Sequence, residues 1–549
     1  MHGQKAENLE GVPSPVRDWT ESGDSQEEMT QAILSDLMTA EFVRVSAATN
    51  LYEEKMRDIR DVAPITQAFE YAAANLFLRW LNGNALEDIR KLVSLIGTIH
   101  RAVPHSQIVT AVYALSLFEE GNLVAAESEF PGLPTKRELT PLIEDLCVKA
   151  LQEIREVRIL NLREPAPARL LLLDTAFPSQ SSSFRYAEFS TYLGQIESSS
   201  YSARPDHNIF KHGEGSDFLH QVERYISESG IAACRIRRFD STELQRVKLA
   251  YCVFLNAADL FFSQIGIPSA EHFVFTLYPG GGFFLDDDHS DAKLRRLCDN
   301  PKLAKIITTQ KLTYDYLVEN NFCEPARLRH VFGVPVPGAF RTSSRPRHIV
   351  SNGEPVRVCF VAHRYSRVGA EKGYDVFADV VRILSNSPDF HFHVVGNYDH
   401  NVVDLGDAKN ITFHGIKPAD FFPRFYAEMD AIVSPNIQMS ELEPSCPAYF
   451  DGFPTTCVVE AGLQGTAMLT TDFLKLNQHL DGTQIFSPEE LQIIDRNPES
   501  IAKLLKKYAY DRAALVRLGE AGRQALLREF SFEKQMRPRI DLLNEYLQN

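Results

Sequence analysis

At 549 residues the chain is too long for one hydrophobic core, so we expect two to four domains. Apolar residues make up 44% and charged residues 24%, as in soluble globular proteins, and the net charge of −16 argues against a general nucleic-acid binder. The sequence holds no apolar run long enough to span a membrane and no apolar signal core near Met1. The eight cysteines are scattered without a Cys-x2-Cys pair, which predicts reduced thiols in a cytoplasmic protein and neither a zinc site nor a disulfide framework.

The N-terminal quarter of the chain has a helical pattern. Residues 1–26 are polar and predict a disordered tail, whereas residues 27–164 predict an α-helical domain. A turn at Gly121 and Asn122 separates an apolar helix from an Ala-rich segment and is faintly similar to a tetratricopeptide helix pair. Because no second copy follows at a fixed period, we predict a helical bundle. Apolar side chains at helical spacing include Leu34, Leu37, Met38 and Phe42.

The middle of the chain predicts a first α/β domain over residues 165–340. Pro165 and Pro167 mark its start, and short apolar runs then alternate with helical segments. Such alternation predicts parallel strands joined by crossover helices. The expected strands are 169–174, 251–255, 273–277 and 304–308.

A second α/β domain is predicted over residues 356–529. It follows a Pro-, Ser- and Arg-rich linker at 338–355 and precedes a C-terminal helix at 530–549. Two doubly wound domains would place ligands at the carboxyl ends of their strands. The expected strands are 356–361, 390–395, 411–413, 431–433 and 467–470.

The stretch from Asp451 to Glu460 is the most informative part of the sequence. Asp451 precedes Gly452, Phe453, Pro454 and Thr455, and a short apolar run then leads to the second acid. A Gly-Phe-Pro turn exposes backbone N–H groups, and the start of a helix after it would favour phosphate. Glu460 would then lie one or two turns into that helix, where a carboxylate can bind sugar hydroxyls.

This stretch resembles the acidic signature of retaining glycosyltransferases of the GT-B fold, family 4 in particular. The usual signature is Glu-x7-Glu, whereas here Asp451 stands first and Glu460 lies nine positions later, so one residue is inserted. The resemblance covers about residues 170–549 and is clearest from 356 onward. It implies an α/β protein with two Rossmann-like domains that face a cleft, preceded here by the helical domain, with residues 530–549 crossing back to the first domain.

The loop after the strand at 356–361 carries the cations that the resemblance assigns to the donor diphosphate. Lys372 precedes Gly373 as in the family, and Arg364, directly after the strand, is the preferred Arg, with Arg367 as competitor. Two cations near a diphosphate would neutralise the charge that grows as the glycosidic bond breaks. In relatives the turn at Gly415 lies near the nucleotide base.

In the first α/β domain, Tyr278 occupies the position where family members often place a His near the reacting sugar carbon. Gly280 and Gly281 follow it, and their backbone could approach a ligand closely. Residues 286–288 are three consecutive aspartates that resemble a metal-binding Asp-x-Asp, but we favour a solvated acidic loop, and no metal is expected.

The resemblance implies a retaining glycosyltransferase that moves a sugar from a nucleotide-diphospho-sugar to a glycan, lipid-linked or protein acceptor, without a further cofactor. Lys372 and Arg364 would stabilise the leaving diphosphate, Glu460 would hold the ribose, and Asp451 with the backbone of 452–455 would hold the donor sugar. The helical domain would form an oligomer, dock a partner enzyme or approach a membrane-linked acceptor, and no nucleic acid is expected.

Two alternatives stay open from the sequence. One is a sugar-nucleotide epimerase or a phosphorylase on the same fold, although no Lys is singled out as a pyridoxal carrier. The other is a non-catalytic interaction protein in which a helical scaffold is joined to a degenerate transferase; the inserted residue after Asp451 and the absent His keep this alternative open. The base, the sugar, the acceptor and the linkage leave no trace in residue types.

Overall fold

A computed structural model describes residues 26–56, 63–81, 88–130, 141–161, 166–205, 218–242, 246–266, 269–341, 353–442 and 448–548. The predicted tail up to residue 25 and residues 342–352 of the predicted linker lie outside these ranges. The chain divides into two units, Met1–Ile159 with Asp240–Glu243, and Leu160–Phe239 with Leu244–Asn549.

The first unit is helical, as its sequence pattern predicts. Three of its helices follow an N-cap residue whose side chain accepts a hydrogen bond from a backbone N–H of the first turn: Asp88 before α4, Ser106 before α5 and Asn122 before α6. Gly121 ends α5 with φ 88°, a conformation that favours glycine. The elements are α1 (Gln26–Met38), α2 (Phe42–Leu51), η1 (Tyr52–Met56), α3 (Ala63–Leu81), α4 (Ile89–Ala102), α5 (Gln107–Glu120), α6 (Leu123–Glu129) and α7 (Pro141–Asn161).

The second unit begins with a parallel sheet that has seven strands within the described residues, in the order β3-β2-β1-β4-β5-β6-β7. The strands are β1 (Leu170–Asp174), β2 (Ser199–Ala203), β3 (Ile236–Arg238), β4 (Val247–Val253), β5 (Ala270–Leu277), β6 (Leu303–Thr308) and β7 (Leu328–His330). The helices between them are α8 (Ser183–Gln195), α10 (Phe218–Ser229), η3 (Ala233–Arg235), α11 (Leu255–Ala258), η4 (Asp259–Ile265), α12 (Asp288–Cys298), α13 (Lys311–Glu319), η5 (Pro325–Arg327) and α14 (Gly338–Arg341).

A second parallel sheet follows, with six described strands in the order β10-β9-β8-β11-β12-β13. Its strands are β8 (Val356–Val361), β9 (Phe390–Val395), β10 (Ile411–Gly415), β11 (Ala431–Ser434), β12 (Ala467–Thr470) and β13 (Gln492–Ile493). Its helices are η6 (Ala370–Lys372), α15 (Tyr374–Ile383), η7 (Ala419–Phe421), α16 (Phe422–Ala427), α17 (Met439–Leu442), α18 (Thr456–Leu463), α19 (Pro498–Tyr510) and α20 (Arg512–Glu529).

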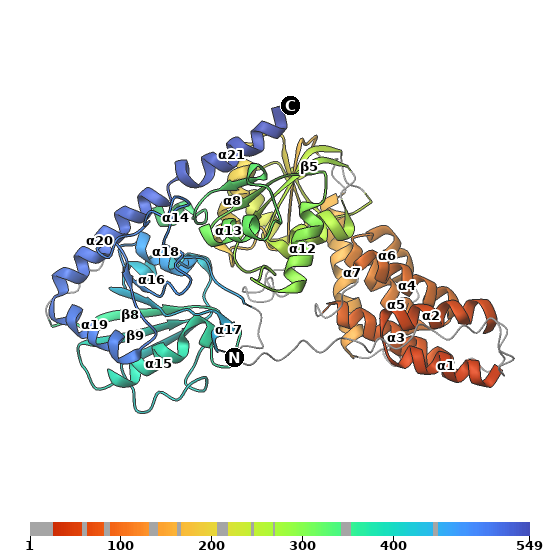
Figure 1. Ribbon diagram of the computed structural model, residues 1–549, viewed down its shortest axis with the longest axis horizontal. Helices are drawn as coiled ribbons and strands as arrows, with labels where there is room; N and C mark the ends of the chain where they lie inside the picture. The colour runs from red at the N-terminus through yellow and green to blue at the C-terminus, as the bar shows by residue number, and fades with distance from the viewer. Residues whose placement is uncertain are drawn as a thin grey trace, which may run out of the picture. The chain divides into compact units, whose positions relative to one another are not determined.

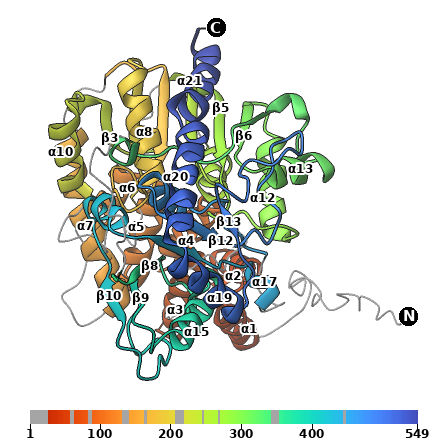
Figure 2. The same cartoon turned by 90° about the vertical axis from the view of Figure 1, so that its left-hand side faces the viewer.

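The last helix, α21 (Phe532–Gln548), returns to the first sheet. Figures 1 and 2 show α20 beside the second sheet and α21 beside α8 and the first sheet. Apolar side chains of α21, among them Ile540 and Leu543, belong to the same buried core as Leu172 and Tyr251. Two doubly wound parallel sheets, a helical region before them and a helix that crosses back confirm the predicted GT-B fold class.

A buried polar cluster joins α21 to the first sheet. We call it the Glu188 cluster, and it consists of a carboxylate from α8, an arginine from α21 and three tyrosines. The Glu188 carboxylate lies 3.8 Å from Arg539 Nε, and both side chains are completely buried. It accepts hydrogen bonds from the hydroxyls of Tyr192 at 2.9 Å, of Tyr278 at 2.7 Å and of Tyr251. Because a buried charge without a partner is strongly unfavourable, the pair holds α21 in place.

Candidate active site

The loop that follows β8 is held in shape by its own polar groups. Glu371, which is buried, accepts hydrogen bonds from the backbone N–H groups of Tyr365 at 3.1 Å and Ser366 at 3.2 Å. The Arg364 guanidinium donates to the backbone carbonyls of Asn397 at 3.1 Å and Arg367 at 2.8 Å. Arg364 therefore fixes the shape of the loop, while the side chain of Arg367 is exposed.

Lys372 lies at the end of this loop and forms an ion pair with Asp451. Its ammonium nitrogen is 2.7 Å from each Asp451 carboxylate oxygen and 3.0 Å from the Tyr449 hydroxyl. Tyr449 also donates to Asp451 at 2.8 Å, and Asn436 donates to the same carboxylate at 2.6 Å. We call these four residues the Lys372 cluster. Two positions predicted from the sequence, Lys372 and Asp451, thus meet, although they are far apart in the chain.

The protonation states of the pair follow from this geometry. Burial raises the pKa of Asp451, but the Lys372 ammonium and the hydrogen bonds from Tyr449 and Asn436 outweigh it, so the net pKa lies below its ordinary value. Burial lowers the pKa of Lys372, but Asp451 and Tyr449 outweigh it and raise the net pKa. Both groups are therefore charged at neutral pH.

The segment between the two acids has the predicted local structure. Gly452, Phe453 and Pro454 lead to Thr455, which lies at the N-cap position of α18 with an extended backbone. Thr455 Oγ1 lies 3.4 Å from the hydroxyl of Ser434, the last residue of β11. The expectation that a helix begins after the Gly-Phe-Pro turn is confirmed. The turn and the last residue of β11 therefore lie at the carboxyl edge of the second sheet.

Glu460 lies one turn into α18 and is 7% exposed. Its Oε1 accepts a 2.6 Å hydrogen bond from the hydroxyl of Ser183, which begins α8 beside the first sheet. Burial raises the pKa of Glu460 to about 7, and the Ser183 hydrogen bond lowers it only in part. Near neutral pH this carboxyl group is therefore close to half protonated.

Lys372 and Glu460 belong to one continuous set of contacts. Asn436, which holds Asp451, accepts a 2.6 Å hydrogen bond from Ser434, and Ser434 contacts the N-cap residue of the helix that carries Glu460. Both predicted groups therefore line the same edge of the second sheet. Gly415 ends β10, the edge strand of this sheet, with φ 70°; apart from its chain neighbours, no described residue lies within 4 Å of the place that a Cβ would occupy.

The structure gives the predicted residues of the first α/β domain the following places. Tyr278 is buried and its hydroxyl donates to Glu188, so in this structure its side chain belongs to the Glu188 cluster. A Cβ at Gly281 would lie 2.2 Å from the ring of Phe254, so this position requires glycine. A Cβ at Gly280 would lie 3.6 Å from the ring of Tyr449, so Gly280 lies near the Lys372 cluster.

The run of three aspartates has a structural role. Asp287 lies at the N-cap position of α12, and its carboxylate accepts a 2.8 Å hydrogen bond from the backbone N–H of Ser290. Within the described residues no group of three or more His, Cys, Asp or Glu side chains is arranged to hold a metal ion. No described helix is long and apolar enough to cross a membrane.

Several residues of the site were not predicted from the sequence. Tyr449 and Asn436 complete the shell around Asp451, and Tyr449 lies only two positions before that residue. Ser183 and Gln310 contact the acidic segment from the first sheet; Gln310 donates to the carbonyl of Phe453 at 3.2 Å. Tyr449 could have been found by its proximity to the motif, whereas the two first-sheet residues depend on how the two sheets meet.

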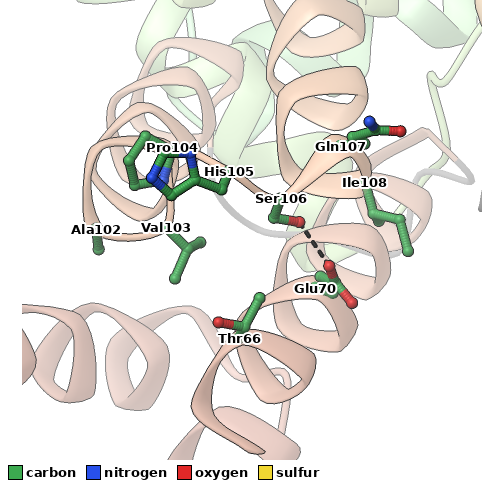
Figure 3. Close-up of a pocket in the computed structure, with 9 residues that line it drawn as sticks. All are labelled: Thr66, Glu70, Ala102, Val103, Pro104, His105, Ser106, Gln107 and Ile108. Atoms are coloured by element: carbon green, nitrogen blue, oxygen red, sulfur yellow. Dashed lines mark hydrogen bonds between the residues drawn. The ribbon is translucent and has the colours of Figure 1, made fainter. Parts of the chain in front are cut away.

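The helical unit contains a separate pocket of about 600 Å³ (Figure 3). It lies at the turn between α4 and α5, opposite α3, and the Ser106 hydroxyl donates to Glu70 at 2.7 Å across it. None of the nine lining residues is Lys or Arg, so the pocket does not suit a diphosphate. They are Thr66, Glu70, Ala102, Val103, Pro104, His105, Ser106, Gln107 and Ile108.

Residues 378–541 match the family model described as "Glycosyl transferase-like". Over this range the chain is similar to glycosyl transferase-like proteins. The match includes Asp451 and Glu460, while Lys372 lies just before it. No curated protein matches the chain.

Solved structures similar to the chain have low sequence identity to it. Anabaena HepE in complex with UDP is 12% identical, with 68% of this chain and 100% of that chain covered and a TM-score of 0.49. A mutant of the Thermobaculum terrenum O-GlcNAc transferase is 13% identical, with 96% and 98% covered and a TM-score of 0.39. An alpha,alpha-trehalose-phosphate synthase (UDP-forming) from Burkholderia vietnamiensis is 11% identical, with 70% and 98% covered and a TM-score of 0.45. At such identities a likeness does not extend to activity.

Proposed function

We propose that the protein is a retaining glycosyltransferase that uses a nucleotide-diphospho-sugar and transfers the sugar to a glycan, lipid-linked or protein acceptor. The observation that carries the proposal is the Lys372–Asp451 ion pair, which lies beside the helix of Glu460 at the carboxyl edge of a parallel sheet. Ligands of doubly wound folds bind at this edge. The match of residues 378–541 to a glycosyl transferase-like family supports the proposal.

The cations of the β8 loop would act on the leaving group. In the free protein the Lys372 ammonium is neutralised by Asp451. A donor diphosphate that enters the site would draw the ammonium toward its oxygens and leave the Asp451 carboxylate to accept hydrogen bonds from the donor sugar. Arg367 is exposed on the same loop and would add a second positive charge, with Arg364 holding the loop in shape.

Glu460 would hold the nucleotide ribose. A ribose hydroxyl would replace the Ser183 hydroxyl, which is the hydrogen-bond donor to Glu460 in the free protein. The acceptor hydroxyl would then attack the sugar carbon from the face that the diphosphate leaves. The carbon–oxygen bond to the diphosphate breaks as the new glycosidic bond forms, and a phosphate oxygen takes the acceptor proton. Catalysis would rest on positioning and on stabilisation of charge.

The proposal includes no metal or further cofactor, because the chain's own cations would neutralise the diphosphate. We also propose that the protein is cytoplasmic, because the seven described cysteines are free thiols. The helical unit would provide the surface for an oligomer, a partner enzyme or a membrane-linked acceptor.

A thermal-shift series tests the proposal. The protein is mixed with UDP, GDP, ADP, dTDP and sugar conjugates of each, and a ligand that binds only the folded state raises the melting temperature. Lys372→Ala should abolish the shift, whereas Lys506→Ala, on the exposed side of α19, should retain it. Analysis of the product formed from an isotopically labelled donor then gives the configuration at the sugar carbon. No shift with any of these nucleotides would contradict the proposal.

A non-catalytic binding module is the second candidate, because the Lys372 charge is already paired and Arg364 is bonded to backbone carbonyls. A protein that binds a nucleotide-sugar but neither transfers nor hydrolyses it would favour this candidate. Conversion of one nucleotide-sugar into another would instead show an epimerase.

A further inference from the structure

The pocket of the helical unit lies between α3 and the turn that joins α4 to α5 (Figure 3). Thr66 and Glu70, which are one turn apart on α3, form one wall. Ser106 joins this wall to α5, because its hydroxyl accepts a 3.2 Å hydrogen bond from the backbone N–H of Val109 and donates to Glu70 at 2.7 Å. The pocket is therefore part of the packed frame of the helical unit.

Glu70 sets the charge of this pocket. It is the only Asp or Glu among the nine lining residues, and none of them is Lys or Arg. Its Oε1 accepts the hydrogen bond from Ser106, and no cation of the described residues forms an ion pair with it. The end of α4 and the start of α5 carry opposite partial charges of about half an elementary charge each, which offset one another. The pocket is therefore negative, and because Glu70 is only half-buried, a cation can reach its carboxylate from solvent.

The walls around this carboxylate are largely apolar. Val103, Pro104 and Ile108 line the pocket with carbon atoms, and Figure 3 shows Val103 and Ile108 to either side of Glu70. A long aliphatic stem that ends in a positive charge matches such a lining, because the stem contacts the apolar walls while the charge meets the carboxylate. Lysine and arginine are the side chains with this structure.

The hydrogen bond within the pocket favours lysine over arginine. The planar fork of arginine pairs best with a carboxylate that offers both of its oxygens. Glu70 Oε1 already accepts the Ser106 hydrogen bond at 2.7 Å, which leaves the other oxygen for a ligand. The ammonium of lysine is a compact charge and needs only one such oxygen.

The size and the opening of the pocket favour a side chain that arrives with its own backbone. Its volume of about 600 Å³ lies among those of sites that enclose a whole ligand, roughly 300–1,000 Å³. The pocket therefore has room for peptide groups beside a lysine side chain. Pro104 and His105, which line it, are exposed, so an approaching chain can reach it.

We infer that this pocket binds a lysine side chain of a partner protein and is a docking site of the helical unit. It contains no residue of the Lys372 cluster and does not depend on the proposed transfer of a sugar. The charge and the apolar lining thus define what a partner must present, namely an exposed lysine on an accessible segment.

Short peptides test the docking site. Ligand-observed NMR with the full-length protein gives the Kd of acetyl-Ala-Lys-Ala-amide and of a matched peptide with norleucine in place of lysine. Norleucine keeps the aliphatic stem and lacks the charge, so its peptide should bind at least about tenfold more weakly. Butylamine carries the charge without a backbone and should also bind more weakly. A Kd of butylamine equal to that of the lysine peptide would overturn a protein partner.

Glu70→Gln removes the charge and keeps the shape of the pocket. The glutamine amide oxygen can still accept the Ser106 hydrogen bond, so the variant should fold. The Kd of the lysine peptide should rise about tenfold, while that of the norleucine peptide should stay within about twofold. Glu41→Gln is the matched control, because Glu41 is exposed in the same unit and its side chain does not cap α2, and both values should stay constant.

Thr66→Lys tests the site from within the chain. A lysine one turn before Glu70 on α3 can place its own ammonium on that carboxylate, so the lysine peptide should bind about tenfold more weakly. No saturable binding of the lysine peptide up to about 10 mM, or a Kd within about twofold of the parent in folded Glu70→Gln, would overturn the docking site. Nucleotide binding should be the same in Glu70→Gln and the parent, so this site and the proposed function can fail independently.

Discussion

The Glu188 cluster and the Lys372 cluster share one carboxylate, one cation and at least one tyrosine hydroxyl, and the Lys372 cluster also contains the Asn436 amide. In the first, the side chains of Glu188 and Arg539 are both completely buried. In the second, the side chains of Lys372 and Asp451 are 10% and 23% exposed. The comparison teaches that similar groups can form a completely buried pair, which holds a helix in place, or a partly exposed pair, which a ligand would be able to reach.

The largest expected effect is on the Glu188 cluster. Arg539→Met leaves the Glu188 carboxylate buried without its cation and should lower the free energy of unfolding by about 3–5 kcal/mol. Urea denaturation measures this change. Arg537→Met on the same helix removes an exposed contact to Glu533 and a cation–π contact with Phe532, and it should change the free energy of unfolding by no more than ~1 kcal/mol. Equal effects of the two substitutions would show that the buried pair does not hold α21.

The Lys372 cluster should respond in activity more than in stability. Lys372→Ala should reduce donor turnover by about 10²–10³-fold, because a group that stabilises the leaving diphosphate is removed. Its effect on unfolding should be smaller than that of Arg539→Met, since the Asp451 side chain left behind is partly exposed. Steady-state kinetics and urea denaturation of the same samples give both values. A larger loss of stability than of activity would assign Lys372 a structural role.

Glu460→Gln should change how stability depends on pH. The unfolded carboxyl group loses its proton near pH 4.5, but the folded one keeps it until about pH 7, so the folded protein loses stability as pH rises between these values. Glutamine does not titrate. Between pH 4 and pH 8 the free energy of unfolding of the variant should therefore rise by roughly 3 kcal/mol relative to that of the parent. Parallel stability–pH curves would mean that the pKa of Glu460 is not raised by folding.

Ser183→Ala should have the smallest effect. It removes the hydroxyl that donates a hydrogen bond to Glu460. A ribose hydroxyl then no longer competes with Ser183 for this carboxylate, so the nucleotide Kd should fall about two- to fivefold. Titration calorimetry measures the change, and Ser181→Ala is the control, because Ser181 is hydrogen-bonded to Ser179 of the same loop. A weaker nucleotide affinity in Ser183→Ala would instead make Ser183 a direct ligand contact.

The sequence was most informative where a motif is local. Lys372 before Gly373, and Glu460 after a Gly-Phe-Pro turn, could be placed because neighbouring residues define both. β2 was missed because Ser199–Ala203 contains no apolar run. The strand can nevertheless lie inside the sheet, because polar side chains find partners nearby; the hydroxyl of Ser199, for example, donates to the carbonyl of Ile196. Short strands such as β13 give too few residues for a pattern.

Residues that depend on distant contacts could not be predicted. Tyr278 was placed near the donor because it occupies the position of a His in the family, but its hydroxyl donates to Glu188 on α8 and lies within hydrogen-bond range of Arg539 on α21. The residues around Tyr278 in the sequence do not indicate these partners. Ser183 and Gln310 likewise join the site only because the two sheets meet at the acidic segment.

The position of α21 has a consequence for biosynthesis. The core of the first sheet includes Met536, Ile540, Leu543 and Leu547, which come after the whole second sheet in the chain order. This core therefore stays incomplete while the second sheet is made, and its unfilled apolar surface must be shielded during that time.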